Sequence, residues 1–392
     1  MVSTESEFTS VEICAGAGGQ AIGLHEAGFR HLALVEIDPH AVKTLRKNID
    51  AREAWSWERE HCDLLHADVK EFVPSRDLEK AGEHWRRYGL DLLAGGVPCP
   101  PFSHAGKQLG EEDERDLFPR MLRLVELLNP RAVMIENVRG IMDPKFSGYR
   151  NSIERQLENS GRVGEEGQAS GPGYTVCKWD VLESSRFGVP QLRPRAVLVA
   201  LRNDVIKDLK YEWPTATHEE PVSIVKALKP SMRERYKRHF EGEDGPEAKA
   251  AYEKWLDTAT RREAVLKGKG GAIAPTLVGG SKKHGGADLG PSRAKAAWAL
   301  LGISGLGVAN DMETCAEKKS QERDLLREGG PMLTVQQAAI VQGFPEDWIF
   351  DGGKTAQYRQ VGNAFPPPVA AAVGRSIMDV LKAARERDAQ GR

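Results

Sequence analysis

The sequence predicts an α/β protein with a doubly wound, mostly parallel sheet and a second, smaller domain. Between residues 9 and 140, short apolar runs alternate with helical or polar stretches; the runs are TSVEIC, HLALVEID, LDLLAGGVP and PRAVMIENV. That alternation is typical of a parallel sheet with helices on both faces. At 392 residues the chain is longer than one compact core usually allows, so a further domain is expected.

Changes in composition predict where the domains divide. The strand-like AVLVAL at 196–201 is expected to complete the large sheet. From about 221 to 300 the chain is rich in lysine and arginine, with glycine-rich breaks and little strand periodicity. Regular patterning resumes near 331, and PPPVAAAVGRSIMDVLKAARE predicts a closing helix. We therefore expect a large domain over 1–204, a smaller domain over 205–345, and a segment over 346–392 that completes the large domain.

The overall composition is that of a globular protein. Hydrophobic residues make up 40% and charged residues 29% of the chain, and no apolar run has the roughly 20 residues of a membrane span. The polar start MVSTESEFTS lacks a secretory pattern, so we expect a cytoplasmic protein. Five scattered cysteines without CxxC spacing favour neither a metal site nor a disulfide framework. The net charge of −2 leaves nucleic-acid binding open, because only a local positive face is needed.

The first motif is a strand, a glycine-rich turn and a helix in EICAGAGGQAIGLHEAGF, residues 12–29. Glycines there let the backbone approach a ligand closely, and the following helix presents its positive N-terminus. Glu36 ends the next strand, where a carboxylate can accept hydrogen bonds from ribose hydroxyls. Asp68 ends the third strand and can accept from an adenine amino group. Each acid alone would be read as a surface residue, but together these features predict a nucleoside-type cofactor.

The second motif is GGVPCPPFSHAGKQLGEEDERDLF, residues 95–118. Cys99 follows an apolar strand and lies between prolines, in a polar segment with no helix to bury its thiol. A lone cysteine is most often a small core residue. In this setting a reactive thiol is the better explanation.

These residues and three later segments resemble a known family. GGVPCPPFS is similar to the catalytic loop of the cytosine-5 DNA methyltransferases, of the kind found in bacterial restriction-modification systems. IENV at 135–138, QLRPR at 191–195 and QYRQVGNAFPPPVA at 357–370 resemble later motifs of that family, in the same order. The resemblance covers almost the whole large domain and fades between about 205 and 330.

The resemblance implies a Rossmann-like fold that uses S-adenosyl-L-methionine, and methylation of carbon 5 of a specific cytosine flipped out of double-stranded DNA. Cys99 would attack carbon 6 of the base, and Glu136 would hold its Watson–Crick edge. Arg195 and Arg193 would supply positive charge facing the base and the nucleophile loop. On an extended segment Gln191 would share one face with these two arginines.

Carried over by position, the resemblance also implies binding residues. The cofactor pocket would be formed by Cys14, Ala17, Gly19, Glu36, Ile37, Asp68, Val69, Gly96, Pro98, Leu117 and Asn363. Ser103 would contact a phosphate of the target strand. The basic composition of the later region separately suggests phosphate contacts by Lys282, Lys283, Arg293 and Lys295, each of which would otherwise be read as a solvated side chain. The 205–345 domain would then read the target sequence.

Three positions depart from the family pattern. Cys14 stands where an aromatic residue usually stacks on adenine. In PMLTVQQAAIVQGFP, residues 331–345, Gln336, Gln337 and Ile340 replace the usual arginine, glutamate and arginine, which puts the packing of the recognition domain in doubt. Ala105 replaces a residue that is frequently small and polar.

Other classes of protein explain less of the sequence. A transfer RNA cytosine-5 methyltransferase would share the fold, but the long basic insert favours a domain that reads duplex DNA. A non-catalytic DNA-binding regulator would have little reason to keep Cys99, Glu136 and Arg195 together. A nicotinamide-dependent oxidoreductase would account for Glu36 but not for PCPPFS or QLRPR. We expect a monomer, with a companion restriction endonuclease as a possible partner.

Overall fold

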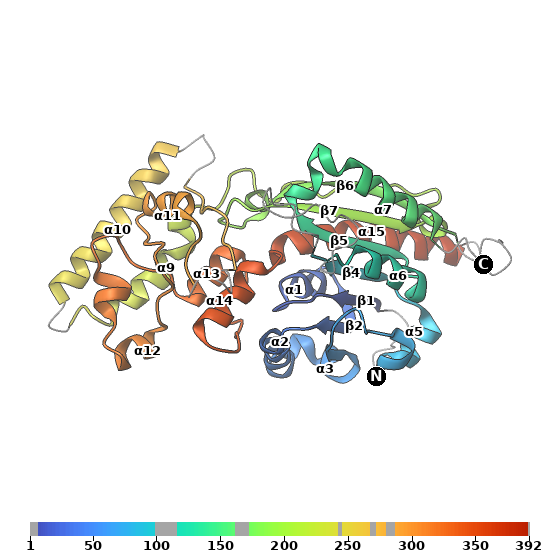
Figure 1. Cartoon of the computed structure of the whole chain (residues 1–392), viewed down its shortest axis with the longest axis horizontal. Coiled ribbons are helices and arrows are strands. Elements are labelled where there is room, and N and C mark those ends of the chain that lie inside the picture. Colours follow the sequence, from blue (N-terminus) through green and yellow to red (C-terminus); the bar gives the residue numbers. More distant parts are fainter. Residues whose placement is uncertain are drawn as a thin grey trace. The chain divides into compact units, whose positions relative to one another are not determined.

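The computed structural model of the chain describes residues 7–98, 116–160, 172–241, 245–266, 272–279 and 287–390. These residues form two compact units (Figure 1). The first unit comprises residues 1–182, 194–215 and 369–392, and the second comprises residues 183–193 and 216–368.

The described part of the first unit is built on a seven-stranded sheet with the strand order β3-β2-β1-β4-β5-β7-β6. Its strands are β1 (Phe8–Ile13), β2 (Phe29–Glu36), β3 (Asp63–His66), β4 (Leu92–Gly96), β5 (Ala132–Val138), β6 (Tyr174–Glu183) and β7 (Pro194–Arg202). Strands β1 to β5 pair in parallel, and β7 pairs with β5 in the antiparallel direction. The predicted doubly wound, mostly parallel sheet is therefore confirmed.

The central strands are apolar because both of their faces are covered. Every residue of β1 is buried, and so are the first four residues of β4. Val11 and Ile13 of β1 pack in one cluster with Leu93 of β4 and Val133 of β5. A strand buried on both faces reads as a continuous apolar run, which is the pattern that the sequence shows.

Helices connect the strands and follow the last one. They are α1 (Gly19–Glu26), α2 (Pro39–Ala51), α3 (Ser56–His61), α4 (Pro74–Asp77), α5 (Gly82–Tyr88), α6 (Phe118–Leu128), α7 (Ser147–Asn159), α8 (Asn203–Ile206) and the C-terminal α15 (Pro367–Gln390) (Figure 1). The start of α2 illustrates the local signals: Asp38 accepts hydrogen bonds from the backbone of His40 and Ala41, and Pro39 follows it. Within the described ranges, no helix combines the length and apolar character that a bilayer crossing requires.

The predicted closing helix is confirmed as α15, which packs closely on α1 in the first unit. A Cβ atom added at Gly374 would lie 2.8 Å from the Cβ of Ala27 and 3.1 Å from a methyl group of Leu24. Since both distances are shorter than normal carbon contacts, glycine is required for this approach.

The described part of the second unit is mainly helical. It contains α9 (Ile224–Lys237), α10 (Gly245–Leu266), α11 (Ser292–Ala299), α12 (Met312–Glu317), a π-helical turn at Glu322–Leu326, α13 (Val335–Gln342) and α14 (Lys354–Asn363). Helix α9 packs against α10 and α13, and α13 packs against α14. The buried Trp255 and Trp298 contribute to its core.

The units divide the chain at other positions than the expected boundaries after 204 and 345. Residues 346–368 belong to the second unit, because α14 packs on α13 there, and only Val369 onward returns to the first unit. Residues 183–193 also belong to the second unit, whereas 205–215 stay with the first. The compact units thus differ from the domains expected from composition, since composition does not reveal which helices pack together.

Helix α13 shows how the unusual glutamine at 337 is accommodated. The Thr334 hydroxyl accepts from the Gln337 backbone at 3.1 Å, and the Gln337 amide oxygen accepts from the Thr334 backbone at 3.2 Å, which completes a capping box. The same amide oxygen accepts from the buried Arg235 at 2.6 Å. Burial lowers the pKa of Arg235 to about 10, so the guanidinium remains charged at neutral pH. The neutral side chain of Gln337 thus serves as the hydrogen-bond partner of the buried Arg235, and the packing at this motif is kept.

We expect Gln337→Glu to raise the free energy of unfolding by about 1 kcal/mol, because a hydrogen bond between two charged groups is stronger than one to an amide. Urea denaturation of wild type and variant measures the change. Gln156→Glu, which adds the same charge on the exposed face of α7, serves as the control. A decrease in stability would mean that desolvation of the new carboxylate exceeds its attraction to Arg235.

Candidate active site

The carboxyl ends of the central parallel strands bring several of the predicted residues to one edge of the sheet. Glu36 is the last residue of β2, Gly96 the last of β4, and Glu136 lies near the end of β5. Gly96 stands directly beside Glu136 in the β4–β5 register. Asp68 follows β3 by two residues. Ligands of open parallel sheets bind at this edge.

The glycine turn after β1 is held against Glu36. The backbone N–H of Gly16 donates to Oε2 of Glu36 at 2.7 Å. Oε1 of Glu36 accepts from the N–H groups of Ile37 at 2.9 Å and Asp38 at 2.8 Å. Gly16 and Gly18 have φ angles of 55° and 90°, which favour glycine. Three hydrogen bonds thus fix the carboxylate at the edge of the sheet.

The surroundings of Glu36 suit a nucleoside. A Cβ atom added at Gly16 would meet nothing within 4 Å, so the backbone there faces open space. Ile37 is 60% exposed, which is unusual for a large apolar side chain beside two acids. Asp68 is half-buried, and its Oδ1 accepts from the Lys70 backbone at 2.9 Å. These features fit S-adenosyl-L-methionine. The carboxylates can accept hydrogen bonds from its hydroxyl and amino groups, and the exposed Ile37 and the open backbone at Gly16 leave space for its rings.

The remaining predicted pocket residues of the first unit surround this edge. Ala17 and Val69 are buried, and Gly19 begins α1. Pro98 and Leu117 meet directly, because the Leu117 N–H donates to the Pro98 carbonyl at 3.3 Å. This hydrogen bond joins the two ends of the segment that contains Cys99, Ser103 and Ala105. Those three residues lie outside the described ranges.

The thiol of Cys14 is close to both strand-end acids. Burial, followed by the negative charges of Glu36 and Asp68, raises the pKa of Cys14 to about 12. At pH 8 only about one molecule in 10⁴ would carry the thiolate there. Cys14 is therefore unsuited to nucleophilic attack.

We expect iodoacetamide at pH 8 to spare Cys14, because the thiolate is the alkylated form. Mass spectrometry of tryptic peptides after timed labelling measures the rate at each cysteine. Cys14→Ser should leave the total labelling rate unchanged. Labelling of Cys14 ahead of the other cysteines would contradict the raised pKa.

Glu136 and Arg195 form an ion pair at the same edge. Nε of Arg195 lies 2.8 Å from Oε1 of Glu136, and the side chains are only 12% and 13% exposed. The pairing of β5 with β7 places Val138 opposite Arg195, so two antiparallel strands position the two side chains. A Cβ atom added at Gly96 would lie 3.1 Å from the other carboxylate oxygen of Glu136. Glycine at 96 leaves room for that oxygen.

Asn137 is a positioning residue that the sequence analysis did not single out. Its side chain is buried, and its amide nitrogen donates to the Val97 carbonyl at 2.8 Å. Its amide oxygen accepts from the Val138 N–H at 2.8 Å. Asn137 thereby ties the end of β5 to the residue that precedes Pro98. Its position inside the IENV motif is the only signal that could have drawn attention to it.

Arg193 does not have the surroundings expected of a residue that faces a base. It is 1% exposed, and in the second unit its guanidinium donates to the carbonyls of Leu277 at 2.6 Å, Gly362 at 2.7 Å and Ala364 at 3.0 Å. Strand β7 begins only at Pro194, so 191–195 is not one extended strand. The expectation that Arg193 directs its charge toward the base remains a prediction, and the three carbonyl contacts lead us to propose that Arg193 positions these backbone segments.

Gln191 belongs to the same buried network in the second unit. Its amide nitrogen donates to Oε1 of Gln342 at 2.8 Å, and its amide oxygen accepts from the Leu277 N–H at 2.7 Å. The network borders Asn363, the predicted cofactor-binding residue of this unit, whose side chain is exposed and lies against the backbone of Gly279. The arginine and glutamine thus set the shape of the 277–279 and 362–364 segments.

Of the predicted DNA contacts, Arg293 and Lys295 lie within the described residues. Arg293 is exposed on the first turn of α11. Lys295 on the same helix pairs with Asp288 at 2.6 Å, so part of its charge is neutralised. Lys282 and Lys283 lie outside the described ranges.

One group of possible metal ligands occurs in the described part of the chain, formed by His25, His31 and Glu58. The ring nitrogens of His31 are already engaged, one with the Ser10 hydroxyl at 2.9 Å and one with the Ala21 carbonyl at 3.0 Å. This group therefore does not offer three free ligand atoms.

Comparisons with known proteins agree with this geometry. The family model of the C-5 cytosine-specific DNA methylases matches residues 8–379. The Type II methyltransferase M.NaeI of Lentzea aerocolonigenes is 43% identical over 97% of this chain and 76% of its own length. The Type II methyltransferase M.NgoMIV of Neisseria gonorrhoeae is 41% identical over 96% of this chain and 99% of its own length.

Solved structures share the fold. The Entamoeba histolytica methyltransferase EhMeth matches with a TM-score of 0.56 at 14% identity, over 95% of this chain and 98% of that one. The Dnmt2 methyltransferase of S. pombe matches with a TM-score of 0.53 at 17% identity, over 95% of this chain and 99% of that one. Since a family model covers nearly the whole sequence, this chain belongs to the C-5 cytosine-specific DNA methylases.

Proposed function

We propose that this methylase transfers a methyl group from S-adenosyl-L-methionine to carbon 5 of a specific cytosine in double-stranded DNA, with Cys99 as the nucleophile. The observation that carries the proposal is the Glu136–Arg195 pair at the carboxyl edge of the sheet. Glu136 lies on β5, next to β4, and the chain continues from β4 through Pro98 to Cys99. A carboxylate, a guanidinium and the start of the nucleophile segment thus meet where this fold binds substrates.

The chemistry begins at the cytosine ring. Carbon 5 is a weak nucleophile, so the Cys99 thiolate first adds to carbon 6, and the electrons of the 5,6 double bond become available at carbon 5. S-adenosyl-L-methionine supplies the electrophilic methyl group that carbon 5 takes up. Loss of the carbon 5 proton and departure of the Cys99 thiolate then restore the double bond. The products are 5-methylcytosine, S-adenosyl-L-homocysteine, the regenerated Cys99 thiolate and the proton lost from carbon 5.

Glu136 and Arg195 serve the ring during the addition step. The Glu136 carboxylate would hold the ring nitrogen and the exocyclic amine of the flipped base, favouring protonation of the ring nitrogen as the carbon–sulfur bond forms. The Arg195 guanidinium, 2.8 Å from Oε1 of Glu136, fixes the direction of that carboxylate. It also places positive charge beside the base carbonyl, where electron density increases. Both side chains are largely shielded from water, which strengthens these interactions.

The residues at the strand ends would hold the cofactor. Glu36 would accept from the ribose hydroxyls and Asp68 from the adenine amino group, while the exposed Ile37 would cover the ring. Pro98 and Leu117, already joined by a backbone hydrogen bond, would close the pocket at the ends of the nucleophile segment. Asn363 remains a cofactor contact proposed from the sequence alone. Cys14 is too small to stack as an aromatic does, so we expect Ile37 to provide most of the apolar contact.

We assign recognition of the DNA sequence to the second unit. Flipping a base out of the stack costs a few kcal/mol, which contacts to the phosphates and neighbouring bases must offset. The lysine- and arginine-rich composition of residues 221–300 supports this assignment, as does the exposure of Arg293. Lys282, Lys283 and Ser103 are proposed as further phosphate contacts from the sequence alone.

The names of the relatives support a proposal for the biological setting. M.NaeI and M.NgoMIV are named Type II methyltransferases. We therefore propose that this enzyme modifies cytoplasmic DNA as a monomer, alongside a restriction endonuclease of the same specificity. The protected sequence can be identified by bisulfite sequencing of a plasmid from a methylation-deficient host that expresses the chain.

Methyl transfer from labelled S-adenosyl-L-methionine to duplex DNA tests the proposed activity. Wild type should transfer label, and Cys99→Ser should abolish transfer while keeping the far-UV circular dichroism of wild type. Cys177→Ser, a half-buried cysteine in β6, is the matched control and should retain activity. An oligonucleotide that carries 5-fluorocytosine in the target sequence should trap wild type covalently, because fluorine cannot leave as the proton does. Transfer to RNA only, or full activity of Cys99→Ser, would refute the proposal.

A further inference from the structure

Helix α9 of the second unit (Figure 1) carries a row of basic residues along its solvent side. Because an α-helix has about 3.6 residues per turn, positions three or four apart lie on the same face. Lys226, Lys229, Arg233 and Lys237 follow these intervals, and all four are exposed. We call this row the α9 basic face. At about 1.5 Å per residue it extends over about 17 Å.

The opposite face of α9 is fixed in the interior of the second unit. The apolar residues of the helix are buried there. The buried Arg235 donates to the Met332 carbonyl at 2.9 Å, and the Tyr236 hydroxyl donates to the Leu325 carbonyl at 2.8 Å. These contacts hold the helix in one orientation, so the α9 basic face has a defined direction toward solvent.

The α9 basic face keeps its positive charge. Within the part of the chain that the structure describes, none of its four side chains forms an ion pair. Glu234 is the only acid in the sequence of α9, and it lines a separate groove with Ser231 and Arg235. The nearest acid on α12, Glu313, lies 3.7 Å from Arg238, which follows the helix. The row therefore has no carboxylate of its own among the described residues.

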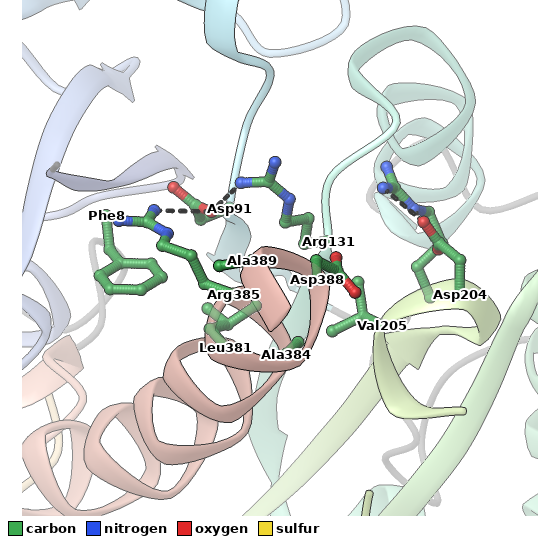
Figure 2. A pocket seen from close by; sticks show the side chains of 11 residues that line it. Phe8, Asp91, Arg131, Asp204, Val205, Leu381, Ala384, Arg385, Asp388 and Ala389 are labelled. Atoms are coloured by element: carbon green, nitrogen blue, oxygen red, sulfur yellow. Dashed lines mark hydrogen bonds and ion pairs between the residues drawn. The ribbon is translucent and has the colours of Figure 1, made fainter. Parts of the chain in front are cut away.

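The arginines beside the amino ends of β4 and β5 show the contrasting arrangement. The Asp91 carboxylate lies between Arg131 at 2.6 Å and Arg385 at 4.0 Å (Figure 2). In the same pocket Arg202 pairs with Asp204 at 2.7 Å. Carboxylates of the chain itself thus balance these arginines, which leaves the α9 basic face as the stronger candidate for an external anion.

The basic face does not stabilise the helix that carries it. Like charges three or four residues apart repel each other, and successive residues of this row all have that spacing. Lys226 lies in the first turn, where the helix dipole disfavours a cation. A helix face that served solubility alone would combine both signs of charge. An external anion would relieve the repulsion.

We propose that the α9 basic face binds the phosphate backbone of duplex DNA without reading its sequence. This inference rests on the proposed methylation of duplex DNA. Each strand of a duplex has one phosphate per about 3.4 Å of its axis, so the row can span about five phosphates of one strand. Its side chains are hydrogen-bond donors only, which suits phosphate oxygens, whereas base edges present both donors and acceptors. Such contacts position a protein on DNA but carry no sequence information.

Fluorescence anisotropy with a short labelled duplex, measured between about 50 and 200 mM salt, tests the proposal. The variant Lys226→Gln/Lys229→Gln/Arg233→Gln removes three charges and keeps Lys237, because a cation in the last turn favours the helix. The slope of log K against log salt should become less steep by about 0.9 for each lost contact, and affinity at about 0.1 M salt should fall roughly 10²- to 10³-fold. Lys229→Gln alone should change the slope by about 0.9.

Two further measurements separate backbone binding from other roles. Arg46→Gln/Arg155→Gln/Lys382→Gln removes the same charge from exposed positions of α2, α7 and α15, and it should keep the wild-type slope. The triple α9 variant should lose the same factor of affinity on a duplex with the methylated sequence and on an unrelated duplex. Its Tm should equal or exceed that of wild type, because repulsion within α9 is removed.

Three outcomes would overturn the proposal. If wild type binds duplex and the triple α9 variant keeps its salt dependence, the phosphate contacts lie elsewhere. If affinity falls only for the duplex with the methylated sequence, the α9 basic face reads bases. If wild type binds neither duplex, the proposed function itself fails, and this inference fails with it.

Discussion

Replacing Glu136 with glutamine is expected to lower the rate of methyl transfer by about 10²- to 10⁴-fold, the usual contribution of a group that assists proton transfer. The amide can still accept a hydrogen bond from Arg195, so the geometry of the pair at 2.8 Å should be kept. It lacks the negative charge that favours protonation of the cytosine ring. Single-turnover methyl transfer to duplex DNA measures the effect directly, because it separates chemistry from product release.

The control for this prediction is Glu126→Gln on α6. Glu126 is also paired with an arginine, Arg123 at 2.6 Å, but the pair is exposed and lies away from the strand ends. Its loss should leave the rate unchanged, since exposed ion pairs contribute little. A Glu136→Gln enzyme that transfers methyl groups at the wild-type rate would remove Glu136 from the chemistry and leave it a structural partner of Arg195.

Replacing Arg193 with methionine is expected to lower the free energy of unfolding by about 3 kcal/mol or more. The change leaves the carbonyls of Leu277 and Gly362 without the Arg193 donor, and each such group costs about 1–3 kcal/mol, whereas the Ala364 carbonyl still accepts from the amide of Gln342. Methionine is of similar length and fills part of the space, so loss of hydrogen bonds dominates over cavity formation. Urea denaturation, followed by tryptophan fluorescence because Trp298 and Trp348 are buried in this unit, measures the loss.

A second measurement separates positioning from direct contact with the base. If Arg193 acts by shaping the 362–364 segment, Arg193→Lys should raise the KM for S-adenosyl-L-methionine more than it lowers kcat, because Asn363, which the sequence predicts to contact the cofactor, lies in that segment. Arg261→Met, at an exposed position of α10, is the control for stability. If Arg193→Met is as stable as wild type but has a lower kcat, the positioning role is contradicted. The result would instead support direct contact between Arg193 and the base.

The strands that the sequence predicts and those that it misses differ in burial. The apolar runs that correspond to β1, β2, β4, β5 and β7 all form strands, because each lies in the interior of the sheet and is buried on both faces. Strand β6 lies at the edge of the sheet and is half-exposed along most of its length. Its sequence YTVCKWDVLE therefore has no continuous apolar run, and the sequence analysis does not identify it.

Some residues of the candidate site could likewise be predicted from the sequence, and others could not. Glu36, Gly96 and Glu136 could be placed together from the sequence, because parallel strands must end at the same edge and each residue terminates or nearly terminates an apolar run. Asn137 could not be assigned, since its role depends on the Val97 carbonyl 40 residues away. The contacts of Arg193 could not be predicted from the sequence either. Its spacing from Arg195 suggests one extended strand with both side chains on the same face, but β7 begins only at Pro194.

The sequence by itself determined the parallel sheet, the order of its motifs and the edge at which the acids and the cysteine segment gather. Periodicity and strand ends are local properties, and residues next to one another in the chain express them. Only the tertiary structure decided which charges meet. The carbonyls that accept from Arg193 belong to residues 84, 169 and 171 positions further along the chain. Such partners are set by how distant elements pack, and no pattern within a short stretch of sequence encodes that packing.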